Sequence, residues 1–198
     1  MVPDARLVSE AVRGNASAFA ELVRRHERSM LALAYACTRC GTTSADVVQE
    51  AYIRVWKRLG DLREPDKFVP WLAQTVRRLS TNALRSPSRR LKLVGDESLD
   101  ANSGVNDTDQ LEREDTARLI DKAIATLDET TASCVMLRYY QDLSSKEIGA
   151  MLDLSPAAVD MRLSRARATL KTALASHVQE DVPRSRSVDE EGSHARVG

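Results

Sequence analysis

The chain has little cysteine and no long hydrophobic run. No stretch of about 18 apolar residues occurs, and no charged segment followed by a short apolar segment opens the sequence, so neither a membrane span nor a secretory signal is indicated. We therefore expect a cytoplasmic protein without membrane insertion. The three cysteines are an odd number, which argues against a disulfide framework in such a chain.

The residue patterns that mark enzymes and metal sites are missing as well. The sequence has no Ser-His-Asp order, no glycine-rich phosphate loop and no close pair of carboxylates in a context typical of a cleft. Cys37 and Cys40 form a lone CxxC pair without a nearby histidine, which is too few ligands for a structural zinc site. A redox role stays open because a helix end can lower the pKa of a thiol, but two ordinary half-buried cysteines are the preferred interpretation. We predict no enzymatic activity, no cofactor and no metal.

Charge of one sign gathers in two segments, although the chain as a whole is neutral, with 29 basic and 29 acidic residues. Residues 54–90 hold ten bases and three acids, a net charge of +7, whereas residues 96–115 hold eight acids and one base, a net charge of −7. This segregation predicts that one part of the chain meets nucleic acid while another part avoids or mimics it.

Helical periodicity dominates the sequence, and signals for β-hairpins are missing. The spacing of apolar residues predicts main helices over about residues 16–36, 44–59 and 66–84, with a short helix before them. Gly41 and the Gly60-Asp61 pair are expected to end the first two.

We predict an all-α protein of two small helical domains. The first spans residues 1–86 and the second residues 109–175, with a polar, acidic and flexible linker over residues 87–108. The last segment, residues 176–198, loses the hydrophobic period and is expected to be disordered.

The second domain carries the pattern of a helix-turn-helix. Ser144 and Glu147 form a capping box that predicts a helix start, and the helix breaks at Asp153. Ser155 can cap a second helix, in which Pro156 takes the first position, where a missing N–H costs nothing. This order is typical of motifs that place the second helix in the major groove of DNA. The alternative is an antiparallel helix pair with a solvated basic face.

The outer surface of this second helix supplies the predicted DNA contacts. Arg162 and Arg165 are the expected anchors because a guanidinium can bind guanine or phosphate, and the N–H groups at the helix start offer another phosphate site. The full set of candidates is Ser155, Ala157, Ala158, Asp160, Met161, Arg162, Arg165 and Arg167.

The stretch from Asp46 to Leu59, DVVQEAYIRVWKRL, has two apolar stripes where a packed helix needs one. The core-facing stripe consists of Val48, Tyr52, Val55 and Leu59. The second line consists of Asp46, Gln49, Ile53 and Trp56, so an aromatic and a β-branched residue stand in line with an acid and an amide. We predict that one face packs inward and that the other face binds a partner.

Three segments resemble one protein family. The stretch DVVQEAYIRVWKRL is similar to region 2.2 of bacterial RNA polymerase sigma factors of the extracytoplasmic-function group, which carries an acid, two apolar residues, Gln-Glu and a later Trp. Residues 68–72, FVPWL, resemble the opening of that family's promoter-reading helix. Residues 147–170, EIGAMLDLSPAAVDMRLSRARATL, resemble its region 4. The resemblance implies a sigma factor that binds core RNA polymerase, recognises promoter DNA and melts it.

In this family the outer face of region 2.2 docks on the coiled coil of the polymerase β′ subunit, and region 4 meets the β flap. The resemblance assigns the β′ contact to Asp46, Gln49, Glu50, Ile53 and Trp56. An Ile and a Trp inside a rim of polar groups can form such a desolvated anchor. The alternative is that Trp56 only completes the core.

The resemblance also assigns DNA contacts, at the minus-ten element to the third helix and at the minus-thirty-five element to the candidates of the helix-turn-helix. The minus-ten set is Lys67, Phe68, Trp71, Arg77, Arg78 and Arg85, beside a loop over residues 62–68 that would capture a flipped base. The chain departs from the family at Arg78, where Asn is usual, and at Leu62, where an aromatic is common. It departs again at Asp160, which repels phosphate but can accept a hydrogen bond from cytosine N4.

Two further expectations concern regulation. In the family the linker threads through the polymerase cleft, so the acids Asp96, Glu97, Asp100 and Asp107 can mimic nucleic acid there, and a merely solvated tether is the alternative. The resemblance to this group also implies an anti-sigma factor as a partner.

Two other protein classes stay open from the residues alone. A dimeric helix-turn-helix regulator would bind a palindromic operator without polymerase. An all-α enzyme is disfavoured because the catalytic patterns are missing.

Overall fold

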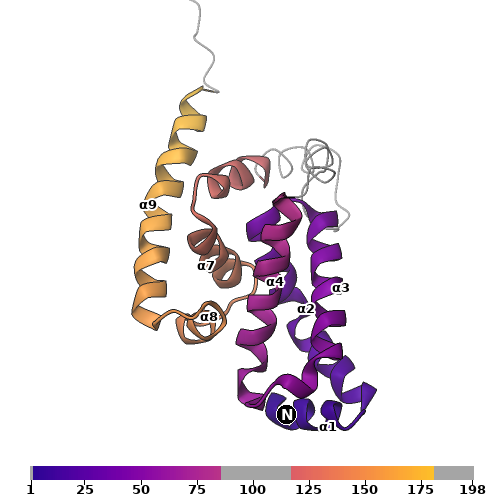
Figure 1. The fold of residues 1–198 in the computed structure, drawn as a ribbon. Helices are drawn as coiled ribbons and strands as arrows, with labels where there is room; N and C mark the ends of the chain where they lie inside the picture. The colour runs from indigo at the N-terminus through magenta and orange to yellow at the C-terminus, as the bar shows by residue number, and fades with distance from the viewer. Residues whose placement is uncertain (1, 86–116, 181–198) are drawn as a thin grey trace, which may run out of the picture.

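The computed structural model describes residues 2–85 and 117–180, with side chains described as far as residue 173. Every regular element among these residues is a helix, which confirms the predicted all-α fold. The first domain contains α1 (Asp4–Val12), α2 (Ala16–Thr38), α3 (Gly41–Lys57), the 3₁₀ turns η1 (Leu59–Asp61) and η2 (Pro65–Lys67), and α4 (Phe68–Arg85) (Figure 1). The second contains a helical stretch over residues 117–125, then α7 (Glu129–Tyr139), α8 (Ser145–Leu152) and α9 (Pro156–Glu180).

Two predicted segments fall wholly or partly outside the described residues. The predicted acidic linker, residues 87–108, lies outside them entirely. The prediction of disorder is wrong for residues 176–180, because α9 continues to Glu180, and residues 181–198 lie outside the described part.

The two ends of α2 are set by local hydrogen bonds. At its start, the Asn15 side chain accepts a hydrogen bond from the Ala18 N–H at 3.2 Å, as a helix cap does. At its end, Arg39 adopts a left-handed backbone conformation with φ 53°. Our prediction that Gly41 stops this helix is wrong, because Gly41 is the first residue of α3. A contact with the second domain accompanies the unusual backbone, since the Arg39 guanidinium donates to the carbonyl of Ile124 at 2.9 Å.

The core of the first domain forms where α2 meets α3 and α4. Leu22 and Leu33 of α2 and Leu72 of α4 have no exposed surface. Burying a side chain of this size contributes about 1.5–3 kcal/mol. The predicted inward stripe of α3 is confirmed, since Val48, Tyr52, Val55 and Leu59 are all buried.

The helix-turn-helix pattern is confirmed in its local details. The Ser144 hydroxyl accepts from the Glu147 N–H at 3.3 Å, and the Glu147 carboxylate accepts from the Ser144 N–H at 2.8 Å. Asp153, with φ 59°, ends α8. The Ser155 hydroxyl then accepts from the Ala158 N–H at 3.2 Å and caps α9. On the inner side of α9, Val159, Leu163 and Ala166 are buried.

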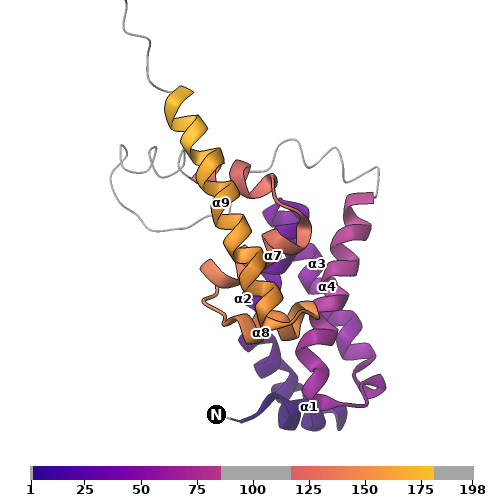
Figure 2. The same cartoon turned by 90° about the vertical axis from the view of Figure 1, so that its left-hand side faces the viewer.

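The two domains pack directly on each other, which the sequence did not predict. Helix α7 lies against α2 and α8 lies against α4, while α9 packs on the outer side of α7 and α8 (Figure 1). Figure 2 shows the same order from the side of α9. Polar contacts across this boundary include Tyr35 Oη to Asp121 Oδ2 at 2.8 Å, Arg39 Nη2 to the Ile124 carbonyl at 2.9 Å, and Arg77 Nε to Glu129 Oε1 at 3.2 Å.

Gly149 allows the tight turn of the helix-turn-helix and yields a stability prediction. A Cβ at this position would lie 2.4 Å from the carbonyl oxygen of Leu154, a backbone atom that cannot swing aside. We expect Gly149→Ala to destabilise the protein by about 1–3 kcal/mol, the usual cost of overpacking. Thermal unfolding followed by circular dichroism measures this, at about 2–4 °C for each kcal/mol.

The matched control is Gly60→Ala, because a Cβ on Gly60 meets no atom within 4 Å. Equal unfolding temperatures for the two variants would show that the α8–α9 turn does not depend on this close approach.

Candidate partner and nucleic-acid interfaces

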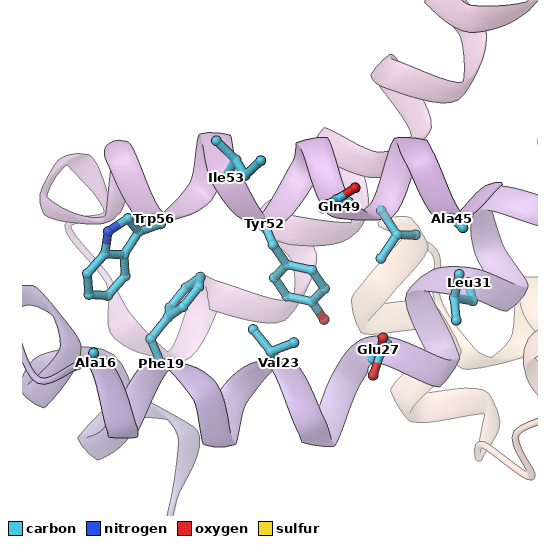
Figure 3. A pocket seen from close by; sticks show the side chains of 11 residues that line it. Ala16, Phe19, Val23, Glu27, Leu31, Ala45, Gln49, Tyr52, Ile53 and Trp56 are labelled. Carbon is cyan, nitrogen blue, oxygen red and sulfur yellow. The ribbon is translucent and has the colours of Figure 1, made fainter. Parts of the chain in front are cut away.

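The second stripe of α3 faces outward beside a groove that α3 forms with α2. Ile53 is 43% exposed and Trp56 is 39% exposed, although both are large apolar residues. The groove has a volume of about 700 Å³, and its wall on α2 includes Phe19, Val23 and Glu27 (Figure 3). Trp56 therefore does not simply complete the core, as the alternative supposed.

An aromatic cluster holds the exposed tryptophan in place. The ring of Phe19 lies 4.7 Å from that of Trp56 at a tilt of 53°, and it meets Tyr52 edge-on at 6.2 Å. Contacts of this kind restrict the side chain before any partner binds. The hydroxyl of Tyr52 is buried without a hydrogen-bond partner among the described residues, and burial together with the charge of Glu27 raises the pKa of this phenol.

Polar groups flank the apolar residues of α3 along its length. A second hollow of about 520 Å³ lies on the other side of the helix, toward α4, and Asp46 and Glu50 line it. Gln49 and Ile53 border both hollows, so they stand on a ridge between them. We call Asp46, Gln49, Glu50, Ile53 and Trp56 the α3 ridge. Glu50 is ion-paired with Arg54 at 2.6 Å, and the other four residues of the ridge are exposed.

The candidates for the minus-ten element lie in and around α4, with one correction. Phe68 has no exposed surface, because it packs into the core with its ring 6.1 Å from that of His26. Its side chain cannot contact DNA from this position, so its assignment as a DNA contact is wrong. The residue anchors the first turn of α4 instead.

The remaining minus-ten candidates fall into two groups. Arg77, Arg78 and Arg85 line one hollow of about 560 Å³, together with Glu129 of the second domain. Lys67 and Trp71 lie in a cleft of about 1000 Å³ whose other wall is α8 and the turn after it. The second domain therefore stands over the face of α4 that carries these residues.

The candidates on α9 differ in how accessible they are. Arg165 is exposed, and its guanidinium makes no hydrogen bond or ion pair with another described residue. Arg162 is half-buried, with Nη1 3.4 Å from the hydroxyl of Thr131 and 3.7 Å from the carboxylate of Asp128. Hydrogen bonds from Thr131 and the nearby charge of Arg162 lower the pKa of Asp128, which caps α7. Arg162 thus supports the fold of the motif, whereas the guanidinium of Arg165 is not engaged by another described residue.

The other α9 candidates divide in the same way. Ser155 serves as the cap of the helix, and Ala158 is half-buried. The exposed members are Ser155, Ala157, Asp160, Met161 and Arg167.

Sequence reasoning missed two residues beside this face. Arg138 at the end of α7 donates to the hydroxyl of Ser145, and that hydroxyl donates to the carboxylate of Asp160. No spacing rule connects these positions, because they come from three separate helices. The sequence signal near these residues is the capping box at Ser144, which predicts an ordered start of α8 but no contact with α7 or α9.

The cysteines and other possible ligands show no metal cluster in the described part of the chain. Burial and the neighbouring Glu129 raise the pKa of Cys37 to about 12, and burial raises the pKa of Cys134 to about 11. Both thiols are therefore protonated at neutral pH, unlike reactive cysteines. Among the described helices, none is long and apolar enough to cross a membrane.

Comparison with known proteins finds a family match for each of the two helical domains. The family model "Sigma-70 region 2" matches residues 22–90, and "Sigma-70, region 4" matches residues 117–170. The chain is 33% identical over 184 residues to the RNA polymerase sigma factor NccH of Alcaligenes xylosoxydans xylosoxydans, covering 87% of this chain and 95% of that protein. It is 27% identical over 173 residues to the ECF RNA polymerase sigma-E factor of Escherichia coli, covering 83% and 90% of the two chains.

A longer relative and a solved structure extend the comparison. The chain is 32% identical over 169 residues to the probable RNA polymerase sigma factor RfaY of Xanthomonas campestris; the match takes in 83% of this chain but only 42% of that relative. The structure of CnrH in complex with the cytosolic domain of CnrY superposes with a TM-score of 0.61 at 27% identity, covering 87% of this chain and 97% of CnrH.

These matches bear on the class of protein. Both domain models come from sigma factors, which bind RNA polymerase and direct it to promoters, so a dimeric regulator that acts without polymerase is not favoured. The matches to NccH and sigma-E cover 95% and 90% of those two proteins. The chain belongs to the sigma-70 family of RNA polymerase sigma factors, in the extracytoplasmic-function group.

Proposed function

We propose that this sigma factor binds the core polymerase through the α3 ridge, with the coiled coil of the β′ subunit as the partner. The observation that carries this proposal is the exposure of Ile53 and Trp56 at the edge of an apolar groove. Apolar anchors inside a polar rim are typical of the residues that dominate the binding energy of protein interfaces. The contact of Trp56 with Phe19 lowers the entropy lost on binding, because the ring is already restrained.

The acids of the ridge and of the facing wall on α2 define the chemistry expected of the partner. Asp46, Glu50 and Glu27 surround the apolar residues, so arginines or lysines on the partner helix would complement them. Acidic groups at the rim also disfavour nucleic acid at this face. The ridge thus suits a basic protein helix.

Trp56→Ala tests this docking. We expect affinity for purified core polymerase to fall by about 30-fold or more, the range of a hot-spot aromatic, while helix content stays unchanged because the ring is partly exposed. Fluorescence anisotropy of labelled protein titrated with core enzyme measures the change. Lys57→Ala is the matched control, since Lys57 is exposed on the same helix and lines neither hollow. Equal affinities for the two variants would remove the ridge from the interface.

We propose further that α4 contributes to melting at the minus-ten element and that the two domains must separate for this to happen. In the closed arrangement α8 forms the opposite wall of the cleft that holds Trp71 and Lys67, which leaves no room there for a DNA strand along α4, and Glu129 is paired with Arg77. A single strand of DNA needs the same aromatic and basic groups. Binding to core polymerase, with region 4 on the β flap, would supply the energy that holds the domains apart. The free chain would accordingly bind promoter DNA weakly.

The interdomain ion pair offers a test of this separation. Glu129→Arg places a positive charge beside Arg77, and we expect up to about fivefold more of the open form, because a half-exposed pair contributes only modestly. Small-angle X-ray scattering of the free protein should show a larger radius of gyration. The charge-swapped double variant Arg77→Glu with Glu129→Arg should restore the compact form. An unchanged radius in Glu129→Arg would mean that this pair does not hold the domains together.

We propose that α9 reads the minus-thirty-five element through its exposed face, with Arg165 as a phosphate or guanine anchor. Its side chain is exposed and not engaged by the protein, and α9 lies on the side of the second domain that faces away from the first (Figure 2). The closed arrangement therefore leaves this face accessible. An anti-sigma factor is a further proposed partner, and the complex of the related CnrH with CnrY supports it.

Arg165→Ala tests how much the charge of this side chain contributes to promoter binding. We expect holoenzyme to bind promoter fragments less tightly at low salt and the slope of log affinity against log salt to flatten by about 0.9, the share of one phosphate contact. Lys122→Ala, which removes an exposed base outside α9, is the control. A slope equal to that of the control would contradict a phosphate contact by Arg165.

A further inference from the structure

A chain of polar contacts holds one acid of the recognition helix in a fixed position. The Ser145 hydroxyl accepts a hydrogen bond from Arg138 and donates its own proton to Oδ1 of Asp160. The Arg138 guanidinium also lies 4.0 Å from that oxygen. The three residues belong to the end of α7, the first residue of α8 and the second turn of α9, so the whole motif must fold before they meet.

Asp160 remains accessible despite these contacts. Its side chain is 66% exposed, whereas that of Arg138 is only 29% exposed. The second carboxylate oxygen, Oδ2, has no hydrogen-bond partner among the described residues. Asp160 lies on the exposed face of α9 with Ala157, Met161, Ser164 and Arg165, which follow helical spacing. The protein thus orients this carboxylate but leaves one oxygen available.

An oriented carboxylate on such a face discriminates among the base pairs of DNA. Guanine presents two acceptors and thymine presents O4 in the major groove, so both repel a carboxylate. Adenine offers an amino group, but its N7 acceptor lies next to it. Cytosine offers the N4 amino group and itself presents no acceptor in the major groove, and it is therefore the base that Asp160 accommodates best.

The positive charge of Arg138 reduces the electrostatic repulsion between the Asp160 carboxylate and the phosphates of DNA. An isolated carboxylate beside phosphates would be repelled, and a mobile one would lose entropy on binding. The guanidinium offsets part of the negative charge, and the Ser145 hydroxyl restrains the side chain before DNA arrives. Both residues act through Asp160 and are positioning residues.

We infer that Asp160 reads a cytosine in the upstream promoter element and that Arg138 and Ser145 position its carboxylate for this contact. The inference rests on the proposed function of α9 as the reader of that element. It adds a base identity and two residues that lie outside the recognition helix.

Selection of promoter fragments by the holoenzyme tests the inference. Core polymerase with the full-length sigma factor is mixed with duplexes randomised across the upstream element, and bound fragments are sequenced. Wild-type protein should prefer cytosine at one position by about tenfold, within the range of a single good base contact. Asp160→Ala should abolish the preference at that position alone. Asp160→Asn should shift it toward adenine, because an amide matches the N6 and N7 groups of that base.

The positioning role of Ser145 and Arg138 is tested by separate variants in the same selection. Ser145→Ala leaves the cap at Ser144 intact, so we expect normal helix content and unfolding temperature but a weaker cytosine preference. Combining Ser145→Ala with Asp160→Ala should produce no further loss at that position, since both act on one contact. Arg138→Lys, which keeps the charge, should retain more of the preference than Arg138→Gln. Lys146→Ala is the control on α8 and should keep the wild-type base profile.

Two negative results have different meanings. If wild-type holoenzyme selects no upstream sequence at all, the proposed role of α9 fails and the inference fails with it. If the wild type selects a sequence and Asp160→Ala keeps the same profile, the inference alone is overturned, and the contacts of Asp160 serve only to pair with Arg138. A full effect of Asp160→Ala without any effect of Ser145→Ala or Arg138→Gln would overturn the positioning role.

Discussion

The packing of α3 against α2 is the constraint on which the first domain depends. Helix α2 is surrounded by α1, α3, α4 and, in the closed arrangement, α7. Helix α3 can bury only one of its two apolar stripes in this arrangement, and Val48, Tyr52 and Val55 take that role. Ile53 and Trp56 are left on the surface because no further helix of the described chain covers them. The exposed ridge is thus a direct result of how the core is filled, and it is the surface that we propose for binding the polymerase.

The second domain presents its two sides to different surroundings. Its inner side, formed by α7 and α8, packs against the first domain beside Trp71 and Arg77 of α4, and its outer side carries α9. A closed chain therefore obstructs part of the surface proposed for melting, although Arg78 and Arg85 stay exposed, while it displays the surface proposed for duplex recognition. The acids Asp121 and Glu129 meet Tyr35 and Arg77 across the boundary. The Arg77–Glu129 pair is half-exposed and therefore individually weak, which suits an arrangement that must open.

Several features could be predicted from the sequence because they depend on local chemistry. The capping box at Ser144 and Glu147 and the cap at Ser155 both involve residues three positions apart, and such contacts form wherever the helix starts. The two stripes of α3 follow from helical spacing alone. The assignment of Phe68 to DNA was wrong because local spacing does not show whether an aromatic in the first turn of a helix packs in the core or contacts DNA. The burial of Phe68 beside His26, which is distant in sequence, decides this. Gly41 was misjudged because Arg39 takes the left-handed position instead.

The amino-acid sequence by itself determined the helices, their caps, the order of the two regions and the surplus of apolar residues on α3, since all of these follow from the nature and spacing of near neighbours. Only the tertiary structure decided that Trp56 packs against Phe19 and that α8 packs against α4. It also decided that Arg138 and Ser145 position Asp160. Each of these contacts joins different helices, and its geometry depends on how the helices pack around a shared core.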